Sequence, residues 1–182
     1  MTDAPFLLTE RLELWKPQVA DLHPMFEIVT HEETRRYLGG HSTLTDHFMR
    51  FTRNAGSWQL YGYGMLMVRR RGGDGTLLGN CGIFHSIRGL GDDFDDRPEA
   101  GWILSADSAG QGYAEEAMRA ILSWFDDAFG SELMCMISMG NAASVRLAGK
   151  LGFAILREAK MPDGKAVNLY RRPAPSGYSS PR

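Results

Sequence analysis

Two glycines two residues apart, Gly110 and Gly112, stand directly before a segment with the apolar spacing of a helix. Glycine adopts positive φ angles that other residues avoid, and because it has no Cβ a ligand can approach its backbone closely. The first N–H groups of a helix have no partner inside the helix and lie at the positive end of its dipole, so they bind anions such as phosphate. The pair therefore indicates either a phosphate-binding turn or an ordinary strand-to-helix turn that needs glycine for its shape.

Two well-known phosphate-binding loops do not fit these glycines. The P-loop motif ends in G-K-[ST], and neither the lysine nor the hydroxyl residue is present here. The dinucleotide fingerprint needs Gly or Ala where Glu115 stands, and it usually belongs to a first βαβ unit, whereas this turn lies past the middle of the chain. The sequence therefore disfavours both of these nucleotide loops.

The elements around the turn read as strand, helix, strand. The apolar run 99–104 precedes the glycines and the apolar run 133–139 follows the helix. The helix itself has a buried stripe at helical spacing: Ala114, Ala117, Met118, Ile121, Leu122 and Phe125. A second helix is predicted over 141–151, ended by Gly152 as a C-terminal cap with Phe153 packing back on it.

The rest of the chain supplies elements of both periods. Alternating residues predict a first strand over 8–14, and helical spacing predicts helices over 19–29 and 45–58, the second with Ser42 or Thr43 as its cap. Further strands are predicted at four places: 64–70 and 77–84, joined by a GGDG hairpin, and 154–158 and 167–171 near the end.

The composition is that of an ordinary globular domain. With 182 residues, 43% hydrophobic and 23% charged, the chain can bury one sizeable core. We expect a single domain over 1–172 and a flexible tail over 173–182, which is rich in Pro, Ser and Gly. Cys81 and Cys135 lie in apolar runs, which favours buried, reduced thiols over a disulfide framework or a metal site.

Charge and hydropathy argue against two classes of partner. A formal net charge of -2 gives no overall attraction to nucleic acid or to an anionic membrane. No apolar run approaches the roughly 20 residues that cross a bilayer. The N-terminus reaches Glu10 and Arg11 too early for a secretory signal. We therefore expect a cytoplasmic protein that binds neither nucleic acid nor membrane.

Two motifs together resemble a known family. The run EAGWILSADSAGQGYAEEA over 99–117, followed by GNAASVRLAGKLGF over 140–153, resembles the GCN5-related N-acetyltransferases (GNAT), and within them the ribosomal-protein (RimJ/RimL-like) branch. The likeness covers nearly the whole chain. It implies a mixed α+β fold with a mostly antiparallel, seven-stranded mixed sheet, helices on both faces, and central parallel strands, 99–104 and 133–139, that splay apart.

The resemblance implies acetyl-coenzyme A (acetyl-CoA) as cofactor. The family motif Gln/Arg-x-x-Gly-x-Gly/Ala cradles the pyrophosphate, and it falls here on Ala109, Gly110, Gln111, Gly112, Tyr113 and Ala114. The leading Gln or Arg is replaced by Ala109, so we expect one charge-assisted contact to be missing, at a cost of about 1 to 3 kcal/mol. Unpaired backbone groups near Trp102, Ile103 and Leu104 are implied to hold the pantetheine arm and to steady the oxyanion.

The implied reaction is direct acetyl transfer from acetyl-CoA to a primary amine, on a protein N-terminus or a small molecule, with no enzyme nucleophile. Asn141 and Ser144 match the family's N-x-x-S, in which the serine is placed to protonate the leaving thiolate. Asn141 is equally a plain helix N-cap, with Ser144 at the third helical position. For the base, Glu99 leads and His85 competes, although each has a structural reading, as an exposed strand-end charge and as a packed histidine.

The acceptor is the least determined part. The segment 89–99 carries four aspartates beside Glu99, which indicates either a solvated loop or a patch that attracts a cationic substrate. A homodimer is possible. Two other classes stay open: a coenzyme A binding module that has lost catalysis, which Ala109 favours, and a protein-interaction domain without cofactor.

Overall fold

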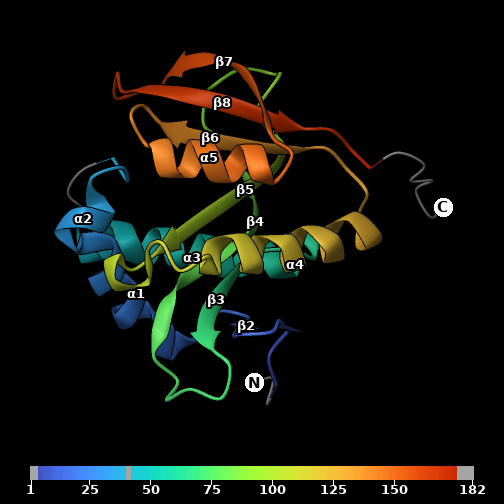
Figure 1. Cartoon of the computed structure of the whole chain (residues 1–182). Helices are drawn as coiled ribbons and strands as arrows, with labels where there is room; N and C mark the ends of the chain where they lie inside the picture. Colours follow the sequence, from blue (N-terminus) through green and yellow to red (C-terminus); the bar gives the residue numbers. More distant parts are fainter. Residues whose placement is uncertain (1–3, 40–41, 176–182) are drawn as a thin grey trace.

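The computed structural model describes residues 4–39 and 42–175. Figure 1 shows one twisted sheet with helices packed around it. The strands are β1 (Leu7–Leu8), β2 (Leu12–Trp15), β3 (Met65–Arg70), β4 (Leu77–Ser86), β5 (Arg97–Leu104), β6 (Leu133–Ser138), β7 (Ala154–Lys160) and β8 (Ala166–Arg172). The helices are α1 (Leu22–Thr30), α2 (Glu32–Arg35), α3 (Leu44–Tyr61), α4 (Tyr113–Ala128) and α5 (Ala142–Lys150).

The predicted mixed α+β fold is confirmed, with one correction to the strand count. In the described residues the sheet has eight strands in the order β1-β2-β3-β4-β5-β6-β8-β7, not seven. The predicted first strand over 8–14 is divided into β1 and β2, which pair with each other through Leu7 and Leu14. Thr9 makes the turn between them, because its Oγ1 accepts a hydrogen bond from the Leu12 N–H at 2.9 Å.

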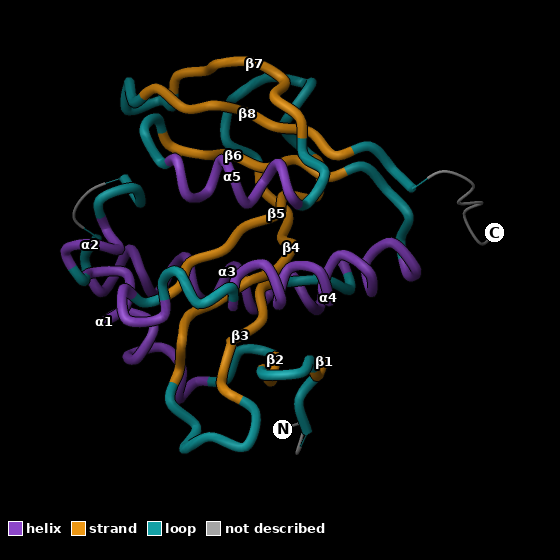
Figure 2. Tube along the Cα trace, viewed as in Figure 1, coloured by secondary structure: helices purple, strands orange, loops and turns teal. Residues whose placement is uncertain are grey.

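The central strands splay as predicted. β5 and β6 form the one parallel pair of the described sheet, and their register holds only at Glu99 with Met134 and at Ala100 with Cys135. β5 nevertheless pairs with β4 along its whole length on the other side. Figure 2 shows the result: β6 to β8 form a separate upper part of the sheet, turned away from β1 to β5 below. Beyond Ala100 the β6-facing backbone of β5 has no neighbouring strand.

Helices cover both faces of the sheet. The largest core cluster packs α4, through Met118, Ile121 and Phe125, against inward residues of β2 to β6. A second cluster packs Met25 and Val29 of α1 against Met67, Leu77 and Ile103, on the opposite face. Alternation along β5 therefore sends Ile103 toward α1 and its neighbours Trp102 and Leu104 toward α4.

Local signals placed the helix ends correctly. The Thr43 side chain accepts from the Asp46 N–H, and the Asp46 carboxylate accepts in return, which starts α3 with a capping box. Gly152 has φ 84° after α5, and the Phe153 N–H bonds to the Ala148 carbonyl at 3.0 Å.

Two expectations concern the whole chain. Most of the predicted flexible tail, residues 176–182, lies outside the described residues, and the single domain over 1–172 stays a prediction. Within the described residues, no helix is both long enough and apolar enough to cross a membrane.

Candidate active site

The turn before α4 is built to present backbone N–H groups. Gly110 has φ 74° and Gly112 has φ 78°, both in the region that side chains avoid. Gly112 is the N-cap of α4, and the first helical bond runs from the Glu116 N–H to the Gly112 carbonyl at 3.0 Å. Within the described residues, the N–H groups from Gly110 to Glu115 make no hydrogen bond. This row of free donors is the predicted anion cradle.

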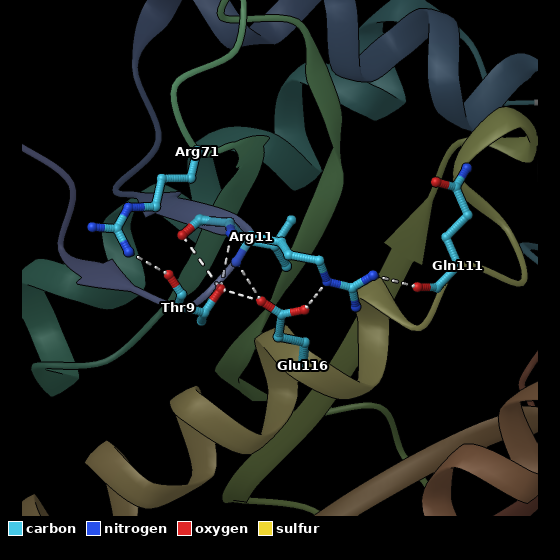
Figure 3. A network of polar contacts seen from close by, with 6 residues as sticks. Thr9, Arg11, Arg71, Gln111 and Glu116 are labelled. Atoms are coloured by element: carbon cyan, nitrogen blue, oxygen red, sulfur yellow. Dashed lines mark hydrogen bonds and ion pairs between the residues drawn. The ribbon is translucent and has the colours of Figure 1, made fainter.

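A polar network fixes the outer side of the cradle (Figure 3). The Arg11 side chain donates from Nη1 to the Gln111 carbonyl at 3.0 Å and from Nε to the Glu116 carboxylate at 2.6 Å. Glu116 also accepts from the Thr9 hydroxyl at 2.6 Å. Because C=O and N–H point in opposite directions across a trans peptide, holding the Gln111 carbonyl toward Arg11 turns the Gly112 N–H away from it. The β1–β2 turn therefore orients the cradle.

The cradle opens onto a cavity of about 620 Å³, called here the glycine cavity. Its walls include Ala109, Gly110, Gly112 and Ala114, together with Trp102 and Leu104 of β5. Gln111 does not line it: its carbonyl faces Arg11 and its side-chain amide donates to the Asp107 carbonyl at 2.7 Å. Apart from Gln111, the predicted cofactor residues are thus brought together around one space.

A second cavity of about 480 Å³, the inner cavity, lies on the α1 and α3 side of β5. It is lined by Phe84, Glu99 and Gly101 among others. The two cavities share wall residues at the splay between β5 and β6: Trp102, Ile103, Asn141 and Ser144. A group bound in the splay therefore faces both spaces.

Asn141 and Ser144 lie where the two cavities meet. The Asn141 Oδ1 accepts from the Ser144 N–H at 3.1 Å, so its interpretation as the N-cap of α5 is confirmed. The Trp102 indole N–H donates to the Ser144 Oγ at 3.1 Å. Because that contact uses the oxygen as acceptor, the hydroxyl proton of Ser144 is free to be donated elsewhere.

Glu99 is buried in the inner cavity, with 3% of its surface exposed. Its carboxylate accepts from Arg88, with Nε to Oε2 at 2.7 Å and Nη2 to Oε1 at 2.8 Å. The Ser86 hydroxyl donates to Oε2 at 2.5 Å. Glu99 is therefore not an exposed strand-end charge. A carboxylate accepts about four hydrogen bonds, so one acceptor position of Glu99 is left for a further partner.

His85 lies on the other face of β4. The Tyr63 hydroxyl, whose pKa burial raises to about 12, donates to the His85 Nδ1 at 3.0 Å, and Nε2 contacts the Asp96 carboxylate at 2.9 Å. The ring stacks on Tyr61 at a centroid distance of 4.1 Å. In the described structure His85 lines neither cavity.

The acidic segment before β5 is used by the protein itself. Asp95 accepts from the N–H groups of Arg88 and Leu90 at 2.9 and 2.8 Å, and Asp93 forms an ion pair with Arg157 at 2.7 Å. None of the four aspartates of this segment lines either cavity in the described structure. The interpretation as a patch for a cationic substrate therefore has no geometric support.

Several site residues carried no signal in the sequence. Arg146 and Lys150 of α5 line the glycine cavity, and basic side chains there suit a phosphate-bearing ligand. They are spaced by one helical turn on a helix that otherwise reads as ordinary. Arg50 and Arg53 of α3 line the inner cavity, opposite the strands. Helical spacing marks these residues as neighbours but does not say which cavity they face.

Both cysteines are free and buried, as predicted. Burial raises the pKa of the Cys81 thiol to about 12, and it raises that of Cys135 well above its usual value. Protonated thiols are poor nucleophiles, which agrees with a reaction that needs no cysteine.

With this geometry in view, the comparisons with known proteins agree. Residues 11–154 match the acetyltransferase (GNAT) domain family. A structure from Bordetella pertussis described as a GNAT-family acetyltransferase is 31% identical, with a TM-score of 0.80, covering 91% of this chain and 98% of that one. The chain therefore belongs to the GNAT acetyltransferase family.

Two further solved structures share the fold at lower identity. One is the microcin C7 self-immunity acetyltransferase MccE in complex with acetyl-CoA and AMP, 14% identical with a TM-score of 0.69, covering 94% of this chain and 97% of that one. The other is a Salmonella typhimurium acetyltransferase that modifies the N-terminal serine of ribosomal protein L7/L12, 15% identical with a TM-score of 0.72, covering 92% and 97%. Identities this low show the fold alone.

Proposed function

We propose that this protein is an acetyl-CoA-dependent N-acetyltransferase that acts on a primary amine. The observation that carries the proposal is the row of unbonded N–H groups from Gly110 to Glu115, which opens into a cavity that meets a second one at the splay of β5 and β6. Membership of the GNAT family and the MccE complex with acetyl-CoA support the choice of cofactor.

The residues present fit the cofactor. The cradle amides and the positive end of α4 suit a diphosphate, and Arg146 and Lys150 supply positive charge on the same cavity wall. These two side chains compensate for the charge that Ala109 lacks. The unpaired edge of β5 beyond Ala100 offers backbone groups to an extended amide-containing arm.

When bound, acetyl-CoA supplies a thioester, whose carbonyl carbon bonds to the amine nitrogen as the carbon–sulfur bond breaks. The chain has three tasks in that exchange. Backbone N–H groups of β5 in the splay stabilise the developing oxyanion. A base removes one proton from the amine, and the Ser144 hydroxyl, oriented by Trp102, returns a proton to the departing sulfur.

We assign the base role to Glu99, acting directly or through a water molecule. Glu99 lines the inner cavity next to Gly101, where the strands separate, whereas His85 faces the opposite side of the sheet between Tyr63 and Asp96. Arg88 and Ser86 hold the carboxylate in one orientation, as a positioned base requires.

The finer assignments are also part of the proposal. Acceptors of both predicted kinds occur on this fold, since the Salmonella typhimurium enzyme modifies a protein N-terminus. The ribosomal-protein branch, a cytoplasmic location and a homodimer stay predictions.

Calorimetry with acetyl-CoA and a thiol-release assay over a panel of amines test the proposal together. We expect saturable binding of acetyl-CoA and release of coenzyme A that depends on an amine. Binding without release across the whole panel would instead indicate a coenzyme A binding module, and the absence of any binding heat would indicate an interaction domain.

A further inference from the structure

The face of α3 that lines the inner cavity is polar. His47, Arg50 and Asn54 recur at helical spacing on this face, with Arg53 beside them, and all four line the cavity. A helix packed over a sheet normally turns an apolar stripe inward. Among these positions of α3 only Phe51 follows that rule. The polar stripe is therefore placed for a ligand rather than for packing.

The charges in this cavity do not balance. Four basic side chains line it, and two are neutralised: Arg88 pairs with Glu99 at 2.7 Å and Lys165 pairs with Asp163 at 2.7 Å. Within the described residues, Arg50 and Arg53 have no carboxylate within the 4.0 Å of an ion pair. The Arg53 guanidinium contacts only the Asn54 side-chain oxygen, at 3.3 Å. The inner cavity thus presents two uncompensated cations.

Their surroundings make these cations receptive to an anion. Burial lowers the pKa of Arg50 and of Arg53, and the positive charge of Arg88 lowers both further. Asp46 acts on Arg50 only from a distance, while its own carboxylate is held by Thr43. An oxyanion between the two guanidinium groups would relieve both desolvation and repulsion.

Two buried polar groups of the same cavity also lack partners. Asn80 of β4 is 6% exposed, and its Oδ1 makes no hydrogen bond within the described residues. The Nδ1 of His47, which is 3% exposed, is likewise unpaired, while its Nε2 contacts the Leu22 carbonyl at 3.1 Å. Buried polar atoms are nearly always satisfied by protein, water or ligand. These atoms point to a polar occupant.

We propose that the acceptor is a small amine that carries an oxyanion, a carboxylate or a phosphate, which Arg50 and Arg53 bind in the inner cavity. The inference rests on the proposed function and adds the substrate class. The amine nitrogen then lies toward Gly101 and Ser144 at the splay, and the anion lies toward α3. A cavity of about 480 Å³ admits a molecule of amino-acid or phosphoamine size.

Matched acceptor pairs test the proposal. In one arm amino acids are compared with their neutral amides, and in the other O-phosphoethanolamine is compared with ethanolamine, so that the two sources of oxyanion are separated. We expect the anionic member of at least one arm to have a kcat/KM about 10-fold higher or more. Arg50→Gln and Arg53→Gln should each raise KM for that acceptor by about 10- to 100-fold and leave kcat and the KM for acetyl-CoA nearly unchanged. Arg171→Gln is the matched control, because Arg171 is exposed and lines neither cavity.

A binding arm makes the result independent of turnover. N-acetylglycine, N-acetylglycinamide and inorganic phosphate are titrated into the wild type and into the Arg50→Gln, Arg53→Gln double variant. Binding of either anion that the double variant loses supports the proposal, even where no acceptor turns over. The proposal is overturned where no anion binds the wild type, or where neutral and anionic acceptors are used equally and lose activity equally. Failure of the proposed function looks different: acetyl-CoA then gives no heat and no thiol is released.

Discussion

The Arg11 guanidinium reaches across 100 residues of sequence to donate a hydrogen bond of 3.0 Å to the Gln111 carbonyl. The contact ties the turn between β1 and β2 to the turn between β5 and α4 (Figure 3). It is a peripheral contact that sets the direction of the cradle peptide, and Arg11 itself does not line the glycine cavity. Its effect on function is therefore indirect.

We predict that Arg11→Gln weakens acetyl-CoA binding by about 5- to 30-fold, as expected for about 1 to 2 kcal/mol of lost charge-assisted hydrogen bonding. Calorimetry gives the dissociation constant directly. Arg71→Gln is the control, because Arg71 bonds to the Thr9 carbonyl of the same turn but not to Gln111. Equal affinities for both variants and the wild type would show that the cradle keeps its direction without Arg11.

Gly112→Val should abolish measurable binding of acetyl-CoA. The residue has φ 78°, and a Cβ there lies 3.4 Å from the Arg11 Nη2, so a branched side chain disturbs both the turn and its support. Gly164→Val has a similar backbone cost at φ 85° but lies in open space in the turn between β7 and β8. Calorimetry on the two variants separates backbone strain from loss of the cradle. Unchanged affinity of Gly112→Val would remove the cradle assignment.

Glu99→Gln should lower kcat by about 100-fold or more and leave the dissociation constant of acetyl-CoA nearly unchanged, since a positioned base contributes roughly 10²- to 10⁴-fold. The variant should also lose the acid limb of the pH–rate profile. Glu132→Gln serves as control, because Glu132 pairs with Arg97 outside both cavities. A variant that is slower only because its fold is damaged would keep the wild-type profile, and Glu99 would then be structural.

His47 should make the fold sensitive to acid. Burial lowers its pKa below the usual 6.5, so the unfolded chain binds this proton more tightly than the folded one. The stability contributed by neutral His47 is therefore present above about pH 6.5 and declines as the pH falls further, by up to about 1.4 kcal/mol per unit of pKa difference. Melting temperatures at about pH 7.5 and about pH 5.5 measure the decline. His47→Gln should reduce it, whereas substitution of the exposed His31 should not.

Much of the site follows from local sequence. Gly110 and Gly112 announce the cradle because only their conformational freedom suits it, and Asn141 announces the start of α5 because its side chain caps the helix. These effects act over a few residues, which is the range that spacing reports. The predicted buried cysteines belong to the same group.

The remainder depends on contacts distant in sequence. The division of the first strand is held by Glu116, which lies 107 residues from Thr9. The buried ion pair of Glu99 with Arg88 is hidden for the same reason, because the loop between β4 and β5 must fold before the two meet. Arg50 and Arg53 look like surface residues of an amphipathic helix until α3 is packed over the sheet.

The short ladder between β5 and β6 divides the molecule mechanically. With two residue pairs joining them, the upper and lower strands are linked at the centre of the sheet chiefly by side-chain packing. Amide exchange with deuterated solvent should therefore resolve two blocks of protection that open separately. An acetyl donor lying in the splay braces one block against the other, so exchange in β6 should slow when the donor binds and quicken again once coenzyme A departs.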